Sequence, residues 1–94
     1  MSARVKSVHH IRDYILEIHF IDDSSGQVDF RSEIVGRGGV FAPLEDVNVF
    51  KQVEVDAEAG TIRWPNGVDF CPDKLHHEAT GAPLPHAQAR NHAA

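Results

Sequence analysis

Apolar and polar side chains alternate from Tyr14 to Phe20, which is the pattern of a β-strand with one buried face. A polar, glycine-ended turn follows and the alternation then resumes, so residues 14–31 are predicted to form a β-hairpin. Residues 4–11 also have a strand-like composition, but their two valines are out of phase. A β-bulge reconciles that spacing, which predicts an irregular strand before the hairpin.

The second half of the chain predicts another hairpin and short helices. Residues 53–64 alternate on either side of a glycine-ended turn, and residues 68–70 would add one more short strand. Asp46 is placed to cap a helix whose apolar side chains recur three residues apart. Pro72 suits the first position of a second helix, in which Leu75 would face the core. The predicted fold class is α+β, in two layers: a small antiparallel sheet built from β-hairpins, with one or two short helices.

A change of composition divides the 94-residue chain near residue 79. From there on Ala, Pro, His, Gln and Asn replace the alternating pattern, and Arg90 is the only charged side chain. Such a segment buries too little apolar surface to offset the entropy lost on ordering. We therefore predict a single domain over residues 1–78 and a disordered Ala/Pro/His tail over residues 79–94.

The charge balance narrows the classes of partner. Nine Lys and Arg against 14 Asp and Glu give a net charge of −5, which argues against direct binding of nucleic acid. Cys71 is the single cysteine, which excludes an internal disulfide and fits a reducing compartment. No apolar run is long enough for a membrane span, and the first residues do not resemble a signal peptide. A cytoplasmic location without membrane contact is expected.

The histidines and Cys71 are the candidates for metal or catalytic chemistry. His76 and His77 would project about 100° apart on a helix, whereas chelating pairs sit three or four residues apart. His9 and His10 alternate across a strand and cannot chelate from one face. A thiolate–histidine pair would also need an orienting third group and an oxyanion site, and no known signature of either is present. We therefore predict no catalytic residue, no metal site and no cofactor.

The most distinctive cluster is Trp64, Asn66, Gly67 and Asp69. On a surface loop, an indole with an amide beside it would form a contact site for a partner, and these four residues are the candidate partner-binding site. In the structural alternative Trp64 fills the core, and Asn66 with Gly67 satisfies the geometry of a turn. Asp69 would then accept backbone N–H bonds near the next helix. Turn chemistry accounts for every residue type, so the structural alternative is favoured.

The run Trp-Pro-Asn-Gly-Val-Asp at residues 64–69 also carries a family resemblance. Together with the segment from Val40 to Leu75, it resembles a widespread family of small bacterial domains of unknown function whose hallmark is Trp-Pro-Asn-Gly-x-Asp. The resemblance covers residues 3–76 and implies a two-layer α+β domain without implying an activity. Members of that family look like partners of a small protein encoded by the adjacent gene, in an arrangement that resembles a toxin–antitoxin pair. The helix-turn-helix that some members add is not expected here, because Pro83 and Pro85 would interrupt a recognition helix in the Ala-rich segment.

These observations favour a protein-binding module over an enzyme. The expected partner is a protein, and the acidic charge of this chain favours a basic one. The family resemblance implies that the adjacent gene encodes this partner and that this chain neutralises it as an antitoxin would. Contact would run through the 64–69 turn or through a sheet edge, which offers unpaired N–H and C=O groups and could also join a second copy. The alternative is a small metal- or His/Cys-dependent hydrolase, which would need a pocket with convergent polar groups.

Overall fold

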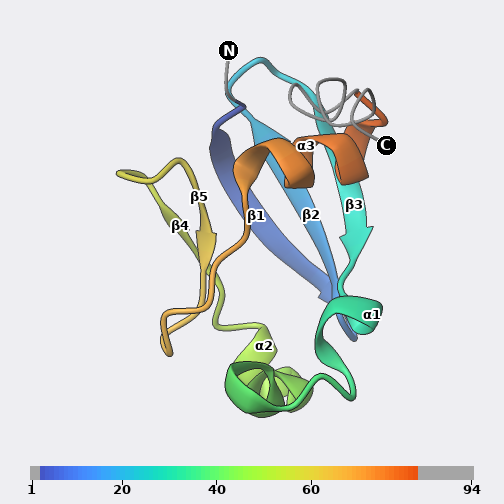
Figure 1. Cartoon of the computed structure of the whole chain (residues 1–94). Helices are drawn as coiled ribbons and strands as arrows, with labels where there is room; N and C mark the ends of the chain where they lie inside the picture. The colour runs from blue at the N-terminus through green and yellow to red at the C-terminus, as the bar shows by residue number, and fades with distance from the viewer. Residues whose placement is uncertain (1–2, 83–94) are drawn as a thin grey trace, which may run out of the picture.

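The computed structural model describes residues 3–82, which form two antiparallel sheets and several short helices (Figure 1). A three-stranded sheet has the order β1-β2-β3 and a two-stranded sheet pairs β4 with β5. The strands are β1 (Val5–Arg12), β2 (Ile15–Phe20), β3 (Ser25–Asp29), β4 (Glu54–Asp56) and β5 (Thr61–Arg63). The helices are α1 (Arg31–Ile34), the 3-10 helix η1 (Gly39–Glu45), α2 (Val47–Phe50) and α3 (Pro72–Thr80). The α+β class predicted from the sequence is confirmed, with two sheets in place of one and more helical segments than expected.

The strand predictions agree with the structure except at one segment. Both hairpins are present, and β1 carries two register shifts against β2, which confirms the irregular strand predicted there. Residues 68–70 do not form a strand: a single bridge pairs Arg63 with Asp69. After the turn, the chain pairs with the end of β5 at this one position and then leaves it, because Pro72 begins α3. Helix α1 was not predicted at all.

Local sequence explains where the helices begin and end. The Asp46 carboxylate accepts a hydrogen bond of 2.9 Å from the backbone N–H of Asn48, which confirms Asp46 as the cap of α2. Pro72 opens α3, as predicted, and Gly81 ends it in the left-handed conformation with φ 81°. Helix α3 therefore extends two residues beyond the predicted domain boundary, and residues 83–94 of the predicted tail lie outside the described residues. Within the described range, no helix is both long and apolar enough to cross a membrane.

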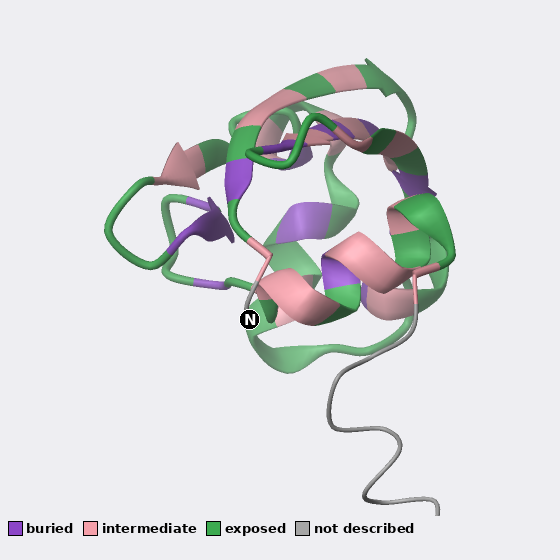
Figure 2. Cartoon of the chain, turned by 90° about the horizontal axis from the view of Figure 1, so that it is seen from above, coloured by how far each residue is buried: buried purple, intermediate pink, exposed green. Residues whose placement is uncertain are grey.

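The core lies between the inner face of the three-stranded sheet and the helices. Figure 2 shows α3 on one side of that sheet, and Leu75 is the buried residue of this helix. Four aromatic rings meet at the centre of the core, with neighbouring centroids 5.2–6.0 Å apart: Phe30, Phe50, Trp64 and Phe70. The fully buried aliphatic side chains are Leu16, Ile18, Ile34, Leu44, Ile62 and Leu75. The outer face of β2 and β3 carries Glu17, His19, Ser25, Gln27 and Asp29 beside the half-buried Ile15.

Candidate functional site

The turn after β5 is held by its own backbone and by one amide side chain. The Gly67 N–H donates to the Trp64 carbonyl over 2.8 Å, and Gly67 has φ 92°, which a residue with a Cβ adopts only under strain. The side-chain oxygen Oδ1 of Asn66 accepts a hydrogen bond of 3.3 Å from the Val68 N–H. These contacts confirm the turn role predicted for Asn66 and Gly67.

Trp64 belongs to the core and not to the surface of this turn. Its side chain is fully buried, and its indole N–H donates to the Phe50 carbonyl over 2.7 Å. The indole ring also packs against the rings of Phe30 and Phe70. In this conformation Trp64 has no surface to offer a partner, so only the other three residues of the candidate partner-binding site are accessible.

Those three residues line a shallow, open hollow of about 270 Å³, hereafter the turn hollow. The Asn66 amide donates to the Val40 carbonyl over 2.9 Å and thereby fixes the turn against η1. The residues that line the turn hollow are Val40, Phe41, Asn66, Gly67, Val68 and Asp69. Val40 is 60% exposed although it is apolar.

The Asp69 side chain does not make the hydrogen bonds predicted for it. Within residues 3–82 its carboxylate makes no hydrogen bond or ion pair, so it accepts none of the predicted backbone N–H bonds. Its backbone forms the bridge to Arg63, which leaves the side chain exposed in the wall of the turn hollow. The turn hollow therefore combines exposed apolar surface with a negative charge that no cation in the described part of the chain pairs.

A second polar cluster joins the β2–β3 turn to α3 and was not predicted from the sequence. His76 Nε2 lies 3.1 Å from Ser24 Oγ and 3.2 Å from Asp22 Oδ2, while Ser24 Oγ donates to Asp22 Oδ1 over 2.5 Å. The His76 ring also contacts the ring of Phe20 edge-on, with centroids 4.8 Å apart. The Ser24 hydroxyl and backbone N–H, together with His76, lower the pKa of Asp22 below its ordinary value.

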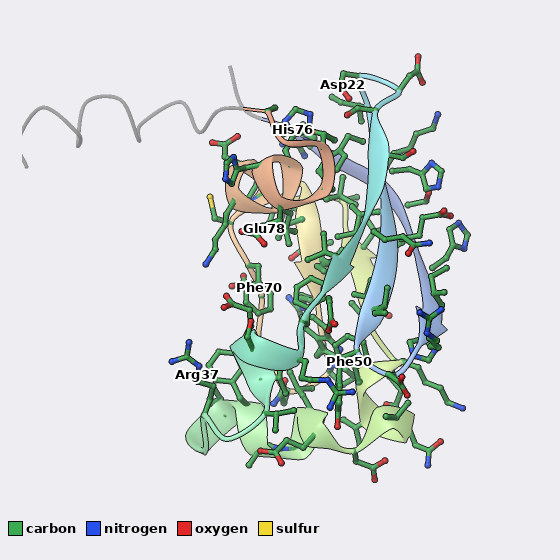
Figure 3. All side chains as sticks on the ribbon, turned by 90° about the vertical axis from the view of Figure 1, so that its right-hand side faces the viewer. Asp22, Arg37, Phe50, Phe70, His76 and Glu78 are labelled. Carbon is green, nitrogen blue, oxygen red and sulfur yellow. The ribbon has the colours of Figure 1, made fainter. Side chains whose placement is uncertain are left out.

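This cluster has the residue types of a Ser-His-Asp triad but not the geometry. In a working triad the carboxylate binds one ring nitrogen and the serine binds the other, so that the imidazole can accept the serine proton. Here Asp22 and Ser24 both approach Nε2, and the Ser24 hydroxyl already donates to the carboxylate of Asp22. Because the pKa of Asp22 is lowered, its carboxylate is a weak base for removing the Ser24 hydroxyl proton. The cluster is therefore a polar clamp between the turn and the helix (Figure 3).

Because of this clamp, we expect the stability of Asp22→Asn to depend less on acid pH than that of the wild type. Because the folded-state pKa of Asp22 is lowered, its stabilising contribution is present above the unfolded pKa and is lost as pH falls below about 4. The urea midpoint of the wild-type protein should fall more between neutral pH and pH of about 3 than that of the variant. Asp23→Asn is the control, since Asp23 makes only an exposed ion pair with Lys6 at 3.8 Å. Equal acid sensitivity of wild type and Asp22→Asn would contradict the assignment.

Cys71 and the other histidines of the described residues are not gathered at one place in the structure. Cys71 is exposed, and within the part of the chain that is described no hydrogen bond joins it to His76 or His77. His77 Nδ1 instead contacts the Ala82 carbonyl at 2.6 Å. His9 and His19 stack edge-on on the outer sheet face, but no three His, Cys, Asp or Glu side chains among residues 3–82 are placed to hold a metal ion.

Comparison with known proteins agrees with the resemblance of the sequence at the level of the family. The family described as "Protein of unknown function (DUF2442)" matches residues 5–81, and the chain belongs to that family. No curated protein and no solved structure matches the chain. The matched range contains both hairpins, the turn hollow and every helix and strand from β1 to α3.

Proposed function

We propose that this member of the family is a protein-binding module whose turn hollow receives an apolar side chain from a basic protein partner. The observation that carries the proposal is the composition of the hollow: Val40, 60% exposed, beside the Asp69 carboxylate, which has no ion-pair partner among residues 3–82. Protein interfaces combine an apolar centre with a polar rim, and the turn hollow has both on a small scale. Its walls are fixed before binding by the hydrogen bond from Asn66 to Val40, which lowers the entropic cost of association.

Charge supports a basic partner. The chain carries a net charge of −5, and an acidic protein attracts a cationic partner and accelerates their encounter. Asp69 in the wall of the hollow offers a local contact for a Lys or Arg side chain. With the family resemblance, this supports an antitoxin-like role in which the chain covers and neutralises a toxin-like protein encoded by the adjacent gene. Trp64 contributes by supporting the turn from the core.

The first experiment measures binding of the purified product of the adjacent gene by isothermal titration calorimetry. Val40→Asp is expected to weaken binding at least about tenfold, because it places a hydrated carboxylate where an apolar side chain should enter. Ile21→Asp is the matched control, since Ile21 is 58% exposed and lies outside the turn hollow. Asp69→Asn should weaken binding less and reduce its dependence on salt.

Two outcomes would contradict the proposal. The first is an equal loss of affinity in Val40→Asp and Ile21→Asp, because binding would then not depend on the turn hollow. The second is the absence of any heat of binding with the adjacent gene product, measured up to a concentration of about 100 μM. The antitoxin-like role has its own test: expression of the adjacent gene alone should slow growth, and co-expression of this chain, but not of Val40→Asp, should restore it.

A further inference from the structure

The strand order leaves β3 at one edge of the three-stranded sheet. The Phe20 N–H donates to the Ser24 carbonyl and the Phe30 N–H donates to the Tyr14 carbonyl. These two hydrogen bonds determine which residues of β3 bond to β2. Because hydrogen-bonded positions alternate along an antiparallel pair, the N–H and C=O groups of the remaining β3 residues point away from β2. Those residues are Ser25, Gln27 and Asp29. Within the described chain their backbone groups have no backbone partner.

The opposite edge of the sheet is protected in ways that β3 is not. Strand β1 has two register shifts, and its Val5 N–H donates to the Gly60 carbonyl, so β4 and β5 lie beside it. Bulges, proline, lysine or a covering element are the usual means of blocking an edge. Strand β3 pairs with β2 in one continuous register and contains neither lysine nor proline. Among residues 3–82, no strand other than β2 pairs with β3, so this edge can accept another strand.

A hollow of about 40 Å³ lies beside this edge, between α3 and α1, and is called the edge hollow below. Its apolar floor is formed by Val28, Phe30, Phe70 and Leu75, and its polar rim includes Glu33, Lys74 and Glu78. Figure 3 looks at this side of the molecule and shows Glu78 on the lower side of α3, above Phe70. The volume suits the tip of a small aliphatic side chain, since one water molecule needs about 10–15 Å³ by this measure.

The charges on the rim are not balanced. Lys74 pairs with Glu33 at 3.1 Å. Within residues 3–82 Glu78 has no ion pair, although it lines the same hollow. On a strand added beside β3, alternate side chains would face the helices, so residues two apart would face the edge hollow and its rim together. A cation two residues from the aliphatic side chain would complement Glu78.

We infer that the β3 edge binds an extended segment of a protein partner by strand addition. Backbone groups of the segment pair with Ser25, Gln27 and Asp29, a small aliphatic side chain enters the edge hollow, and a Lys or Arg two residues away reaches Glu78. A second copy of this chain fits less well, because the helix-facing residues of its own β3 are Gly26, which has no side chain, and Val28, which is buried in its own core. The edge shares no residue with the turn hollow, so this inference does not depend on the proposed function.

The test uses the full chain and the peptide acetyl-TVTVTKT-amide, which presents valine and lysine on one face. At a peptide concentration of about 1 mM, the amide NMR signals of Ser25, Gln27 and Asp29 should shift. Gln27→Pro should weaken binding at least about tenfold, because it removes an edge N–H without breaking a β2–β3 hydrogen bond. Gln27→Thr keeps the N–H and is the matched control. Replacing the peptide lysine by glutamate should also weaken binding.

The inference has several outcomes that would overturn it. They are the absence of these amide shifts at about 1 mM peptide, equal binding by Gln27→Pro and wild type, and shifts confined to the turn hollow. If Gln27→Pro does not fold, a peptide with N-methylated backbone amides is tested against the wild-type chain, and equal binding of that peptide would again overturn strand addition. A dimer of the free chain that Gln27→Pro dissociates would show that a second copy occupies the edge. Val40→Asp should leave peptide binding unchanged, which separates this result from a failure of the proposed function.

Discussion

Trp64→Ala is expected to lower the free energy of unfolding by about 3–5 kcal/mol, the range for removing a fully buried large aromatic side chain. The indole is fully buried, and its ring contacts three phenylalanine rings of the core. Its N–H also satisfies the Phe50 carbonyl, so alanine would leave both a cavity and an unpaired acceptor. For a domain of 94 residues such a loss is a large part of the total stability.

The measurement is urea unfolding followed by far-UV circular dichroism, because the substitution removes the only tryptophan of the chain. Trp64→Phe is the control: it keeps an aromatic ring but loses the N–H, and it should cost clearly less than alanine. An unchanged midpoint for Trp64→Ala together with lost partner binding would contradict the core assignment and return Trp64 to the interface.

Local pattern was sufficient to predict the two hairpins, the starts of α2 and α3, and the character of the core. The alternation from Tyr14 to Phe20 predicted β2 because one face of that strand is buried and the other is not. Asp46 and Pro72 predicted helix starts because capping depends only on neighbouring residues. Helix α1 was missed, although Asp29 supplies a local signal: its carboxylate accepts the Arg31 N–H over 3.0 Å.

The candidate sites depend on contacts between distant segments, which no local pattern encodes. Ser24 and His76 are 52 positions apart, and Asn66 and Val40 are 26 apart. The sequence indicated a turn within residues 64–69, but the turn hollow exists only because η1 packs against it. Asp69 was interpreted through local turn chemistry, and the fold instead leaves its carboxylate exposed. Which strand lies at the edge of the sheet is likewise set by the strand order, and the hairpin pattern does not determine that order.

A close approach between β3 and α3 gives the second large expected effect, for Gly26→Ala. The sequence predicted that Gly26 ends a turn, but Gly26 lies within β3 and faces the last turn of α3. A Cβ added there would lie 1.9 Å from the Ala79 carbonyl oxygen and 2.7 Å from its carbon. Both atoms are backbone, so the clash cannot be relieved by a side-chain rotation. The strand and the helix would have to separate.

We therefore expect Gly26→Ala to destabilise the protein by about 2–3 kcal/mol, as overpacking does in a well-packed interior. In an ordinary strand position the same change would be stabilising, because glycine loses more entropy on folding than alanine. Urea unfolding gives the magnitude, and hydrogen exchange should show faster exchange in the last turn of α3 than in β2. Gln27→Ala, at an exposed position of the same strand, is the control.

The double variant Gly26→Ala with Ala79→Gly separates a backbone clash from a side-chain clash. Removing the Ala79 side chain leaves its carbonyl in place, so the double variant should be no more stable than Gly26→Ala. Because glycine is a poor helix former, we expect the double variant to lose a further ~1 kcal/mol. Recovery of wild-type stability would instead place the conflict at the Ala79 methyl group and would require α3 to pack against β3 at a greater distance between their backbones.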